Sequence, residues 1–101
     1  MKTVHKFSNV NINGNVIDIE IRYIYVIYAL YINNRIKKVY LCEKCYELDN
    51  RIKKCRFHFS INKHSCSIIL TIYNESYLPY EEIPKIVSAE LFIDDKKILN
   101  S

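Results

Sequence analysis

Four side chains near the middle of the chain have the types and the spacing of a zinc site. They are Cys42, Cys45, Cys55 and His58, in the pattern Cys-x2-Cys-x9-Cys-x2-His. Thiolates and a neutral imidazole are ligands that tetrahedral zinc binds in structural sites, and two close pairs lower the entropic cost of assembling the site. The spacing therefore favours one candidate function, a small metal-dependent domain.

The same segment can instead form a β-hairpin with buried cysteines. Apolar residues alternate with period two on both sides of Lys63-His64, which predicts antiparallel strands over 55–61 and 66–73. The predicted buried set is Cys55, Phe57, Phe59, Cys66, Ile68 and Leu70. A turn centred on Lys63-His64 sets Cys55 opposite Ile72. Cys55 and His58 then point to opposite faces and cannot bind one metal, so we expect Cys55 and Cys66 to be buried thiols and expect no cofactor, with zinc as the alternative.

Strand-forming residues dominate the rest of the chain as well. Clean alternation between Ile17 and Tyr25 follows Asn13-Gly14, which is the strongest short hairpin signal. The predicted strands lie at about 3–12, 15–25, 35–41, 87–93 and 96–99, with turns at Asn33-Asn34 and Asp94-Asp95. The apolar run after Tyr23 predicts a central strand covered on both sides, or a strand that bends between sheets.

These elements predict an all-β fold, an antiparallel β-sandwich of seven to eight short strands, with a small barrel as the second choice. The strand-rich run at 25–32, with its turn and lysine-rich return, is similar to many Ig-like accessory domains. With 101 residues, the chain is expected to be one domain over 1–101.

Two short sequence patterns occur twice. Residues 30–35 (LYINNR) match 91–96 (LFIDDK), and the string NRIKK occurs at 34–38 and again at 50–54. Duplication of a strand unit explains these patterns, and so does convergent turn chemistry in a lysine-rich chain.

Composition bears on the origin of the protein and on its location. Ile, Lys, Asn and Tyr make up nearly half of the residues, and all four have AT-rich codons, which favours a viral, phage or other AT-rich genome. No secretory signal is recognisable, so we expect reduced cysteines and a cytoplasmic protein, in the host cytoplasm if it is viral. The longest apolar run, 23–32, is about half of a membrane span, so no membrane partner is expected.

Positive charge is concentrated in one part of the chain. Residues 34–56 carry eight basic and three acidic side chains, in a chain of net charge +4. The candidate nucleic-acid contacts are Arg35, Lys37, Lys38, Arg51, Lys53 and Lys54, because clustered cations bind phosphates with release of counterions. The alternative is that these lysines are solvated and protect exposed strands from edge-to-edge pairing.

The proline-flanked segment 74–84 is the longest predicted loop. Its candidate partner-binding residues are Tyr77, Tyr80, Glu81 and Glu82, because a stiffened loop with tyrosines suits protein recognition. The alternative is a structural connection whose tyrosines fold back onto the sheets.

No Gly-rich phosphate loop or nucleophile elbow occurs, so an enzyme is not expected. The sequence thus favours a non-enzymatic accessory factor that occludes a protein partner. The alternative is a zinc-dependent nucleic-acid-binding domain built on residues 33–66. Homo-oligomers remain compatible with either function.

Overall fold

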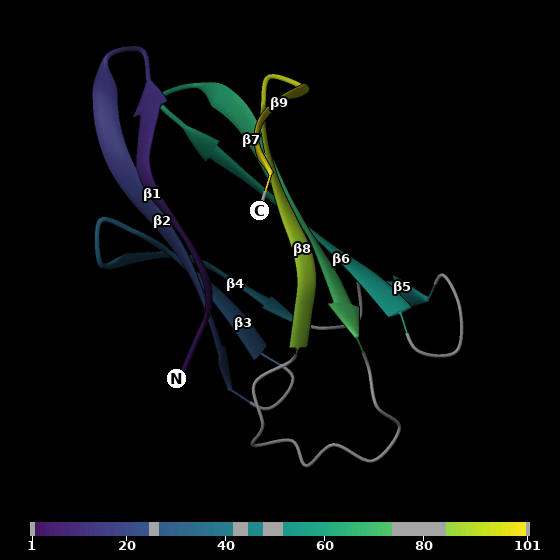
Figure 1. The fold of residues 1–101 in the computed structure, drawn as a ribbon. Helices are drawn as coiled ribbons and strands as arrows, with labels where there is room; N and C mark the ends of the chain where they lie inside the picture. The colour runs from purple at the N-terminus through teal and green to yellow at the C-terminus, as the bar shows by residue number, and fades with distance from the viewer. Residues whose placement is uncertain (1, 25–26, 42–44, 48–51, 74–84, 101) are drawn as a thin grey trace. The chain divides into compact units, whose positions relative to one another are not determined.

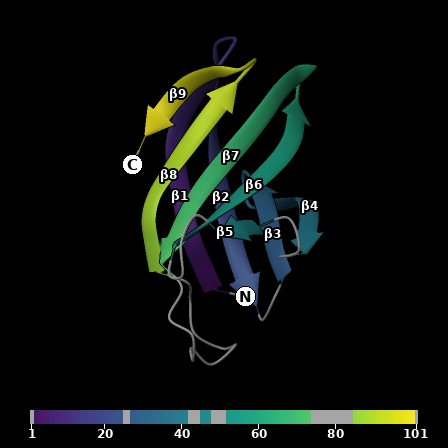
Figure 2. The same ribbon diagram turned by 90° about the vertical axis from the view of Figure 1, so that its right-hand side faces the viewer.

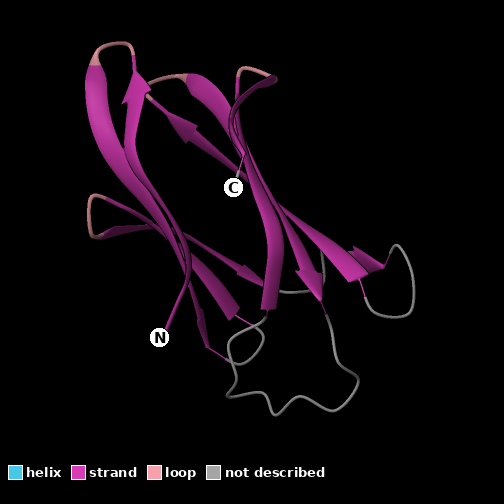
Figure 3. Cartoon of the chain, in the orientation of Figure 1, coloured by secondary structure: helices cyan, strands magenta, loops and turns pink. Residues whose placement is uncertain are grey.

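A computed structural model of the protein describes residues 2–24, 27–41, 45–47, 52–73 and 85–100. These residues form strands joined by short turns, with no helix among them (Figures 1 and 3). The strands are β1 (Lys2–Ile12), β2 (Asn15–Ile24), β3 (Ile27–Ile32), β4 (Arg35–Leu41), β5 (Cys45–Glu47), β6 (Ile52–Ile61), β7 (His64–Tyr73), β8 (Lys85–Ile93) and β9 (Lys96–Asn100). The described part of the chain thus contains nine strands, where the sequence predicted seven or eight.

The strands form two antiparallel sheets, each in a separate compact unit. Sheet A has the order β1-β2-β3-β4, and sheet B, whose strands are labelled in Figure 2, has the order β5-β6-β7-β8-β9. The predicted all-β class is confirmed, and two open sheets are consistent with a β-sandwich rather than a closed barrel. Each sheet is a continuous meander, whereas immunoglobulin domains distribute successive strands over both sheets. The similarity to Ig-like domains therefore does not extend to the connectivity. The single-domain assignment over 1–101 stays a prediction.

Four hairpins turn through two residues that both have positive φ. These pairs are Asn13-Gly14, Asn33-Asn34, Asn62-Lys63 and Asp94-Asp95. Positive φ at both positions is the pattern of the type I′ turn, whose twist matches that of the flanking strands. Asn and Asp tolerate this left-handed region better than other non-glycine residues, so the three turns predicted from Asn and Asp pairs are confirmed.

The β6–β7 hairpin buries the predicted apolar face, but in a different register. All six predicted core residues are buried. The turn lies at Asn62-Lys63, so Cys55 is opposite Leu70 and not opposite Ile72. The predicted turn, centred on Lys63-His64, was two residues too long, since Asn62 and Lys63 alone form the turn, both with positive φ. A shift of two residues preserves the face of every side chain, which is why the burial pattern was nonetheless correct.

We expect Lys63→Gly to raise the free energy of unfolding by about 0.5–1 kcal/mol. Lys63 has a φ of 68°, where a β-carbon is strained and glycine is not. Lys63→Ala keeps the β-carbon, so it should give no such gain. Thermal and urea denaturation of both variants provide the measurement. Equal stabilisation by glycine and alanine would show that the lysine side chain, and not the backbone, is unfavourable here.

In sheet A the chain reverses within the apolar run. β2 ends at Ile24 and pairs with β3 from Ile27 onward, so the expectation of one continuous strand is wrong. No Gly, Pro, Asn or Asp signals this reversal in the sequence. The central-strand expectation holds for β3 itself, since Tyr28, Ala29 and Leu30 are consecutive and all buried.

The β3–β4 and β8–β9 hairpins have the same local geometry. Both continue past a type I′ turn into a register shift, between Leu30 and Tyr31 in β3 and between Leu91 and Phe92 in β8. In each hairpin the first turn residue also bonds the adjacent strand, through Asn33 in sheet A and Asp94 in sheet B. The match between residues 30–35 and 91–96 therefore corresponds to an equivalent structure, which both duplication and convergent turn chemistry would produce.

Candidate functional site

The loop predicted to bind a partner lies outside the described residues. Tyr77, Tyr80, Glu81 and Glu82 all belong to residues 74–84. Protein recognition through these side chains therefore stays a prediction.

The two cysteines of the β6–β7 hairpin differ in oxidation state. Cys55 is buried and disulfide-bonded, whereas Cys66 is a buried thiol whose Sγ lies 3.6 Å from the main-chain oxygen of His64. The predicted burial is confirmed for both, but the prediction of a reduced thiol is wrong for Cys55. The alternation of residues along β6 and β7 indicates which face a side chain lies on, and not whether a cysteine is bonded. The neighbouring strand on the other side of β6 is β5, where the main chain of Cys45 lies directly opposite Cys55.

The described residues do not assemble the predicted zinc site. Cys42 and the side chain of Cys45 lie outside the description. Cys55 is buried and His58 is exposed three residues along the same strand, so they lie on opposite faces, as expected. A sulfur in a disulfide also lacks the thiolate that zinc binds. No group of three His, Cys, Asp or Glu side chains in the described chain is suited to a metal ion. Zinc binding would require the reduced protein.

The predicted nucleic-acid contacts are distributed over both units. Arg35, Lys37 and Lys38 lie on β4 of sheet A and are exposed, whereas Lys53 and Lys54 lie on β6 of sheet B and are half-buried. Arg51 is outside the described residues. One continuous patch formed by the two NRIKK strings therefore stays a prediction, and the exposed cations of β4 form the part that the structure describes.

Residues 35–39, which we name the β4 edge, are exposed without interruption. β4 is an end strand of sheet A, and its neighbour in the sheet is β3. The edge includes two large apolar side chains, Ile36 with an exposed fraction of 58% and Val39 with 52%. From the sequence, this strand was expected only as a basic return, and the exposed apolar pair beside its cations was not predicted.

The pairing with β3 shows on which face of the sheet each side chain of the β4 edge lies. Ile36 is opposite Tyr31 and Val39 is opposite Ala29, so both apolar residues share one face. Lys38 is opposite Leu30 on the other face, with its Nζ 5.2 Å from the centre of the Tyr40 ring. A register shift makes Lys37 the extra residue between these positions. The β4 edge thus presents an apolar face and a cationic face.

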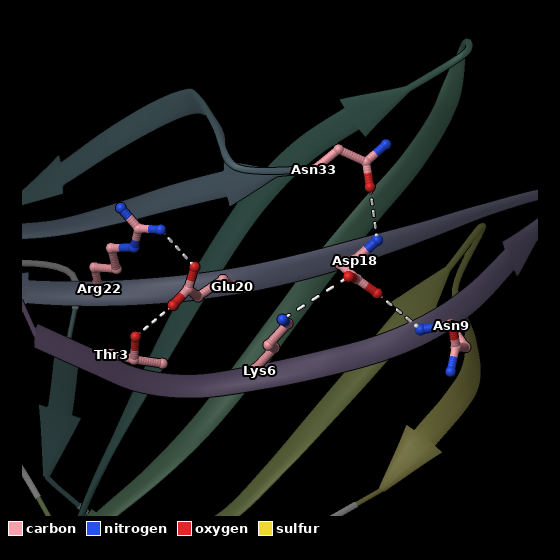
Figure 4. Close-up of polar contacts among 7 residues, drawn as sticks. All are labelled: Thr3, Lys6, Asn9, Asp18, Glu20, Arg22 and Asn33. Carbon is pink, nitrogen blue, oxygen red and sulfur yellow. Dashed lines mark hydrogen bonds and ion pairs between the residues drawn. The ribbon is translucent and has the colours of Figure 1, made fainter.

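The neighbouring face of sheet A is polar and internally paired. Lys6 lies 3.8 Å from Asp18, and Arg22 lies 2.8 Å from Glu20, which also accepts a hydrogen bond from Thr3 (Figure 4). The hydrogen bond from Arg22 is the main reason why the pKa of Glu20 is lowered. The guanidinium of Arg22 also stacks 3.9 Å from the centre of the Tyr31 ring. These contacts hold Tyr31 beside the apolar face of the β4 edge.

Two cations of the β4 edge, Arg35 and Lys37, keep their positive charge among the described residues. Within the described chain, no carboxylate forms an ion pair with Arg35 or Lys37. On the equivalent strand of sheet B the charge is compensated, because Lys97 lies 2.7 Å from Glu90. The position of Glu90 corresponds to Ala29 in the matching hairpin. An attractive site for an anionic group therefore remains on β4 and not on β9.

His64 and Asp94 form a second polar contact, at the turn of the β8–β9 hairpin. Nδ1 of His64 lies 2.6 Å from Oδ2 of Asp94, and the main-chain N–H of Ser65 donates to Oδ1 of Asp94. The main-chain N–H of Asp94 donates in return to the Ser65 carbonyl. Asn33 makes the same two-way contact with Asp18 in sheet A, visible in part in Figure 4. The shared geometry points to a structural role, not to an acid–base pair.

We expect the unfolding free energy to fall in acid more steeply in the natural protein than in Asp94→Asn. The hydrogen bond from His64 lowers the pKa of Asp94 below its ordinary value of 3.8. The stabilisation is therefore complete above that value and is lost as the pH falls through the lower, folded-state pKa. Asparagine at position 94 should keep the turn geometry, because Asn33 has the same geometry in the β3–β4 hairpin. Asp95→Asn removes the same charge without this bond, and urea unfolding at several pH values should leave its acid slope unchanged. Equal acid slopes for Asp94→Asn and Asp95→Asn would contradict the lowered pKa of Asp94.

Comparison with known proteins does not assign the chain to a family. No protein-family model matches it, and no curated protein or solved structure shows significant similarity to it. In the part of the chain that the structure describes, no helix has the length and hydrophobicity to cross a membrane.

Proposed function

We propose that the protein is a non-enzymatic binding factor that occludes a protein partner, and that the β4 edge is its contact surface. The observation that carries this proposal is the uninterrupted exposure of residues 35–39, where apolar and cationic side chains lie together on an end strand. Strand edges with open main-chain groups are recurrent sites of protein recognition. The abundance of Ile, Lys, Asn and Tyr, whose codons are AT-rich, supports an origin in a virus, a phage or another AT-rich genome.

The disulfide of Cys55 bears on where this function takes place. Disulfides persist in oxidising compartments and are rare in the cytosol of most organisms. The cytoplasmic location expected from the sequence is therefore the less favoured one, and we propose that the protein meets its partner in an oxidising environment.

Position-specific photo-crosslinking tests the proposed contact surface. A photoreactive residue at Val39 should form an adduct with one protein of the source organism or its host. The matched control is Val16, which is exposed to a similar extent on β2. An adduct at position 39 that is lost when Lys37 and Lys38 are replaced by Glu supports the proposal. Equal adducts at both positions, or none at position 39, contradict it.

A nucleic-acid-binding domain is the second candidate, and the three exposed cations of β4 are the observation in its favour. Binding through so few phosphate contacts should be weak and should depend strongly on salt. We expect no saturable binding of a single-stranded oligonucleotide near physiological ionic strength, as measured by fluorescence anisotropy. Saturable binding that is lost in Lys37→Glu/Lys38→Glu would instead favour the nucleic-acid function.

A further inference from the structure

The β4 edge has the geometry needed to accept an additional strand. β4 is paired with β3 and lies at the end of its sheet. In such a strand, alternate residues direct their main-chain N–H and C=O groups away from the sheet, where an incoming strand can bond them. Because residues 35–39 are all exposed, the two side-chain faces that flank these groups are also accessible.

The charge of the β4 edge distinguishes between two strands that could pair with it, the β4 strand of a second copy of the protein and an acidic strand of a partner. Arg35, Lys37 and Lys38 place three cations in four positions, and the edge contains no anion. A second copy of the protein that paired β4 against β4 would set these cations against each other, which destabilises a strand pair. A strand with carboxylates would set opposite charges together, which stabilises it. The same side chains that oppose self-association therefore favour an acidic strand.

We infer that the β4 edge binds an extended, acidic peptide segment of a partner protein by strand addition. This inference rests on the proposed function and adds the chemistry of the partner. Because Ile36 and Val39 share one face and Lys38 lies on the other, the segment should alternate carboxylates with β-branched residues. Its apolar side chains cover Ile36 and Val39, and its carboxylates bind the cationic face.

Sheet B contains a matched edge on which this binding should fail. β9 follows the same type of turn and register shift as β4, and it also begins with exposed cations, Lys96 and Lys97. However, Glu90 neutralises Lys97 at a distance of 2.7 Å. Charge reversal at Lys96 and Lys97, which occupy the positions of Arg35 and Ile36 in the matching hairpin, therefore provides a control with the same change in net charge on an end strand of the other sheet.

The probe is a fluorescent peptide that alternates Glu and Val, with a length of about ten residues, at the upper end of strand lengths in globular proteins. Anisotropy titration of the full chain should show saturable binding. Lys37→Glu/Lys38→Glu should weaken it at least ~10-fold, because attraction between the carboxylates of the peptide and the two lysines becomes repulsion. Lys96→Glu/Lys97→Glu should change it less than ~3-fold, since those positions are outside the proposed site. The same peptide with N-methylated alternate residues should not bind, because it lacks the main-chain donors.

Several results would overturn the inference. Equal binding of the N-methylated peptide would show charge attraction without strand addition. Tighter binding of a single-stranded oligonucleotide than of the peptide would identify a nucleic-acid surface. A dimer in light scattering that Val39→Pro abolishes would identify a second copy as the occupant. If the peptide fails to bind while the photoreactive residue at position 39 still captures one protein, the inference of an acidic partner strand is wrong and the proposed contact surface stands. If both fail, the proposed function is wrong as well.

Discussion

Replacement of Phe57 by alanine is expected to lower the free energy of unfolding by about 3–5 kcal/mol. Phe57 is 3% exposed and lies on β6, an interior strand of sheet B. Truncation of a buried phenylalanine loses the transfer free energy of the ring and leaves a cavity that the neighbours fill only in part. Because its cross-strand neighbour Ile68 is also buried, the cavity should be large. Urea unfolding followed by circular dichroism measures the effect.

Arg56→Ala is the matched control for this variant. Arg56 is the preceding residue on the same strand and is exposed, so its truncation should change the unfolding free energy by no more than about 0.5 kcal/mol. If Phe57→Ala and Arg56→Ala had similar effects, the alternation of buried and exposed residues along β6 would be wrong.

Removal of the disulfide at Cys55 is the second large effect that we expect. Cys55→Ala should lower the unfolding free energy by about 2–4 kcal/mol more than Cys66→Ala, because a disulfide restricts the unfolded chain. The comparison isolates the covalent link, since Cys55 and Cys66 are 1% and 2% exposed and lose the same side-chain atoms.

A reducing agent provides an independent check on the same bond. It should lower the melting temperature of the natural protein towards that of Cys55→Ala and leave Cys55→Ala itself unchanged. Peptide mapping without reduction will identify the cysteine that is bonded to Cys55. A melting temperature that does not respond to reduction, with the bond shown to be open, would contradict a stabilising role.

The elements with local chemical signals could be predicted from the sequence. Asn13-Gly14, Asn33-Asn34 and Asp94-Asp95 identified three turns, because their residue types tolerate positive φ. Period-two alternation gave the correct buried face of β6 and β7. The register was not correct, because alternation cannot distinguish a two-residue turn from a four-residue turn.

The features without a local signal could not be predicted. The bulge in β1, where Asn9 has a φ of 58° and its N–H donates to Asp18, keeps Phe7 and Val10 on one buried face despite their spacing of three residues. The exposure of Ile36 and Val39 also depends on the position of β4 at the end of its sheet. Strand order is a property of the whole sheet and not of the residues in one strand.

The meander order of the sheets has a consequence for the rate of folding. Every described strand pairs with strands adjacent to it in the sequence, so the contacts within each sheet are local for a β protein. Short sequence separation keeps the entropic cost of loop closure small. We therefore expect each sheet to form faster than the sheets of a Greek-key sandwich of this length. Strands made early during synthesis can pair before the C-terminal strands leave the ribosome, which shortens the time that unpaired edges are exposed to other chains.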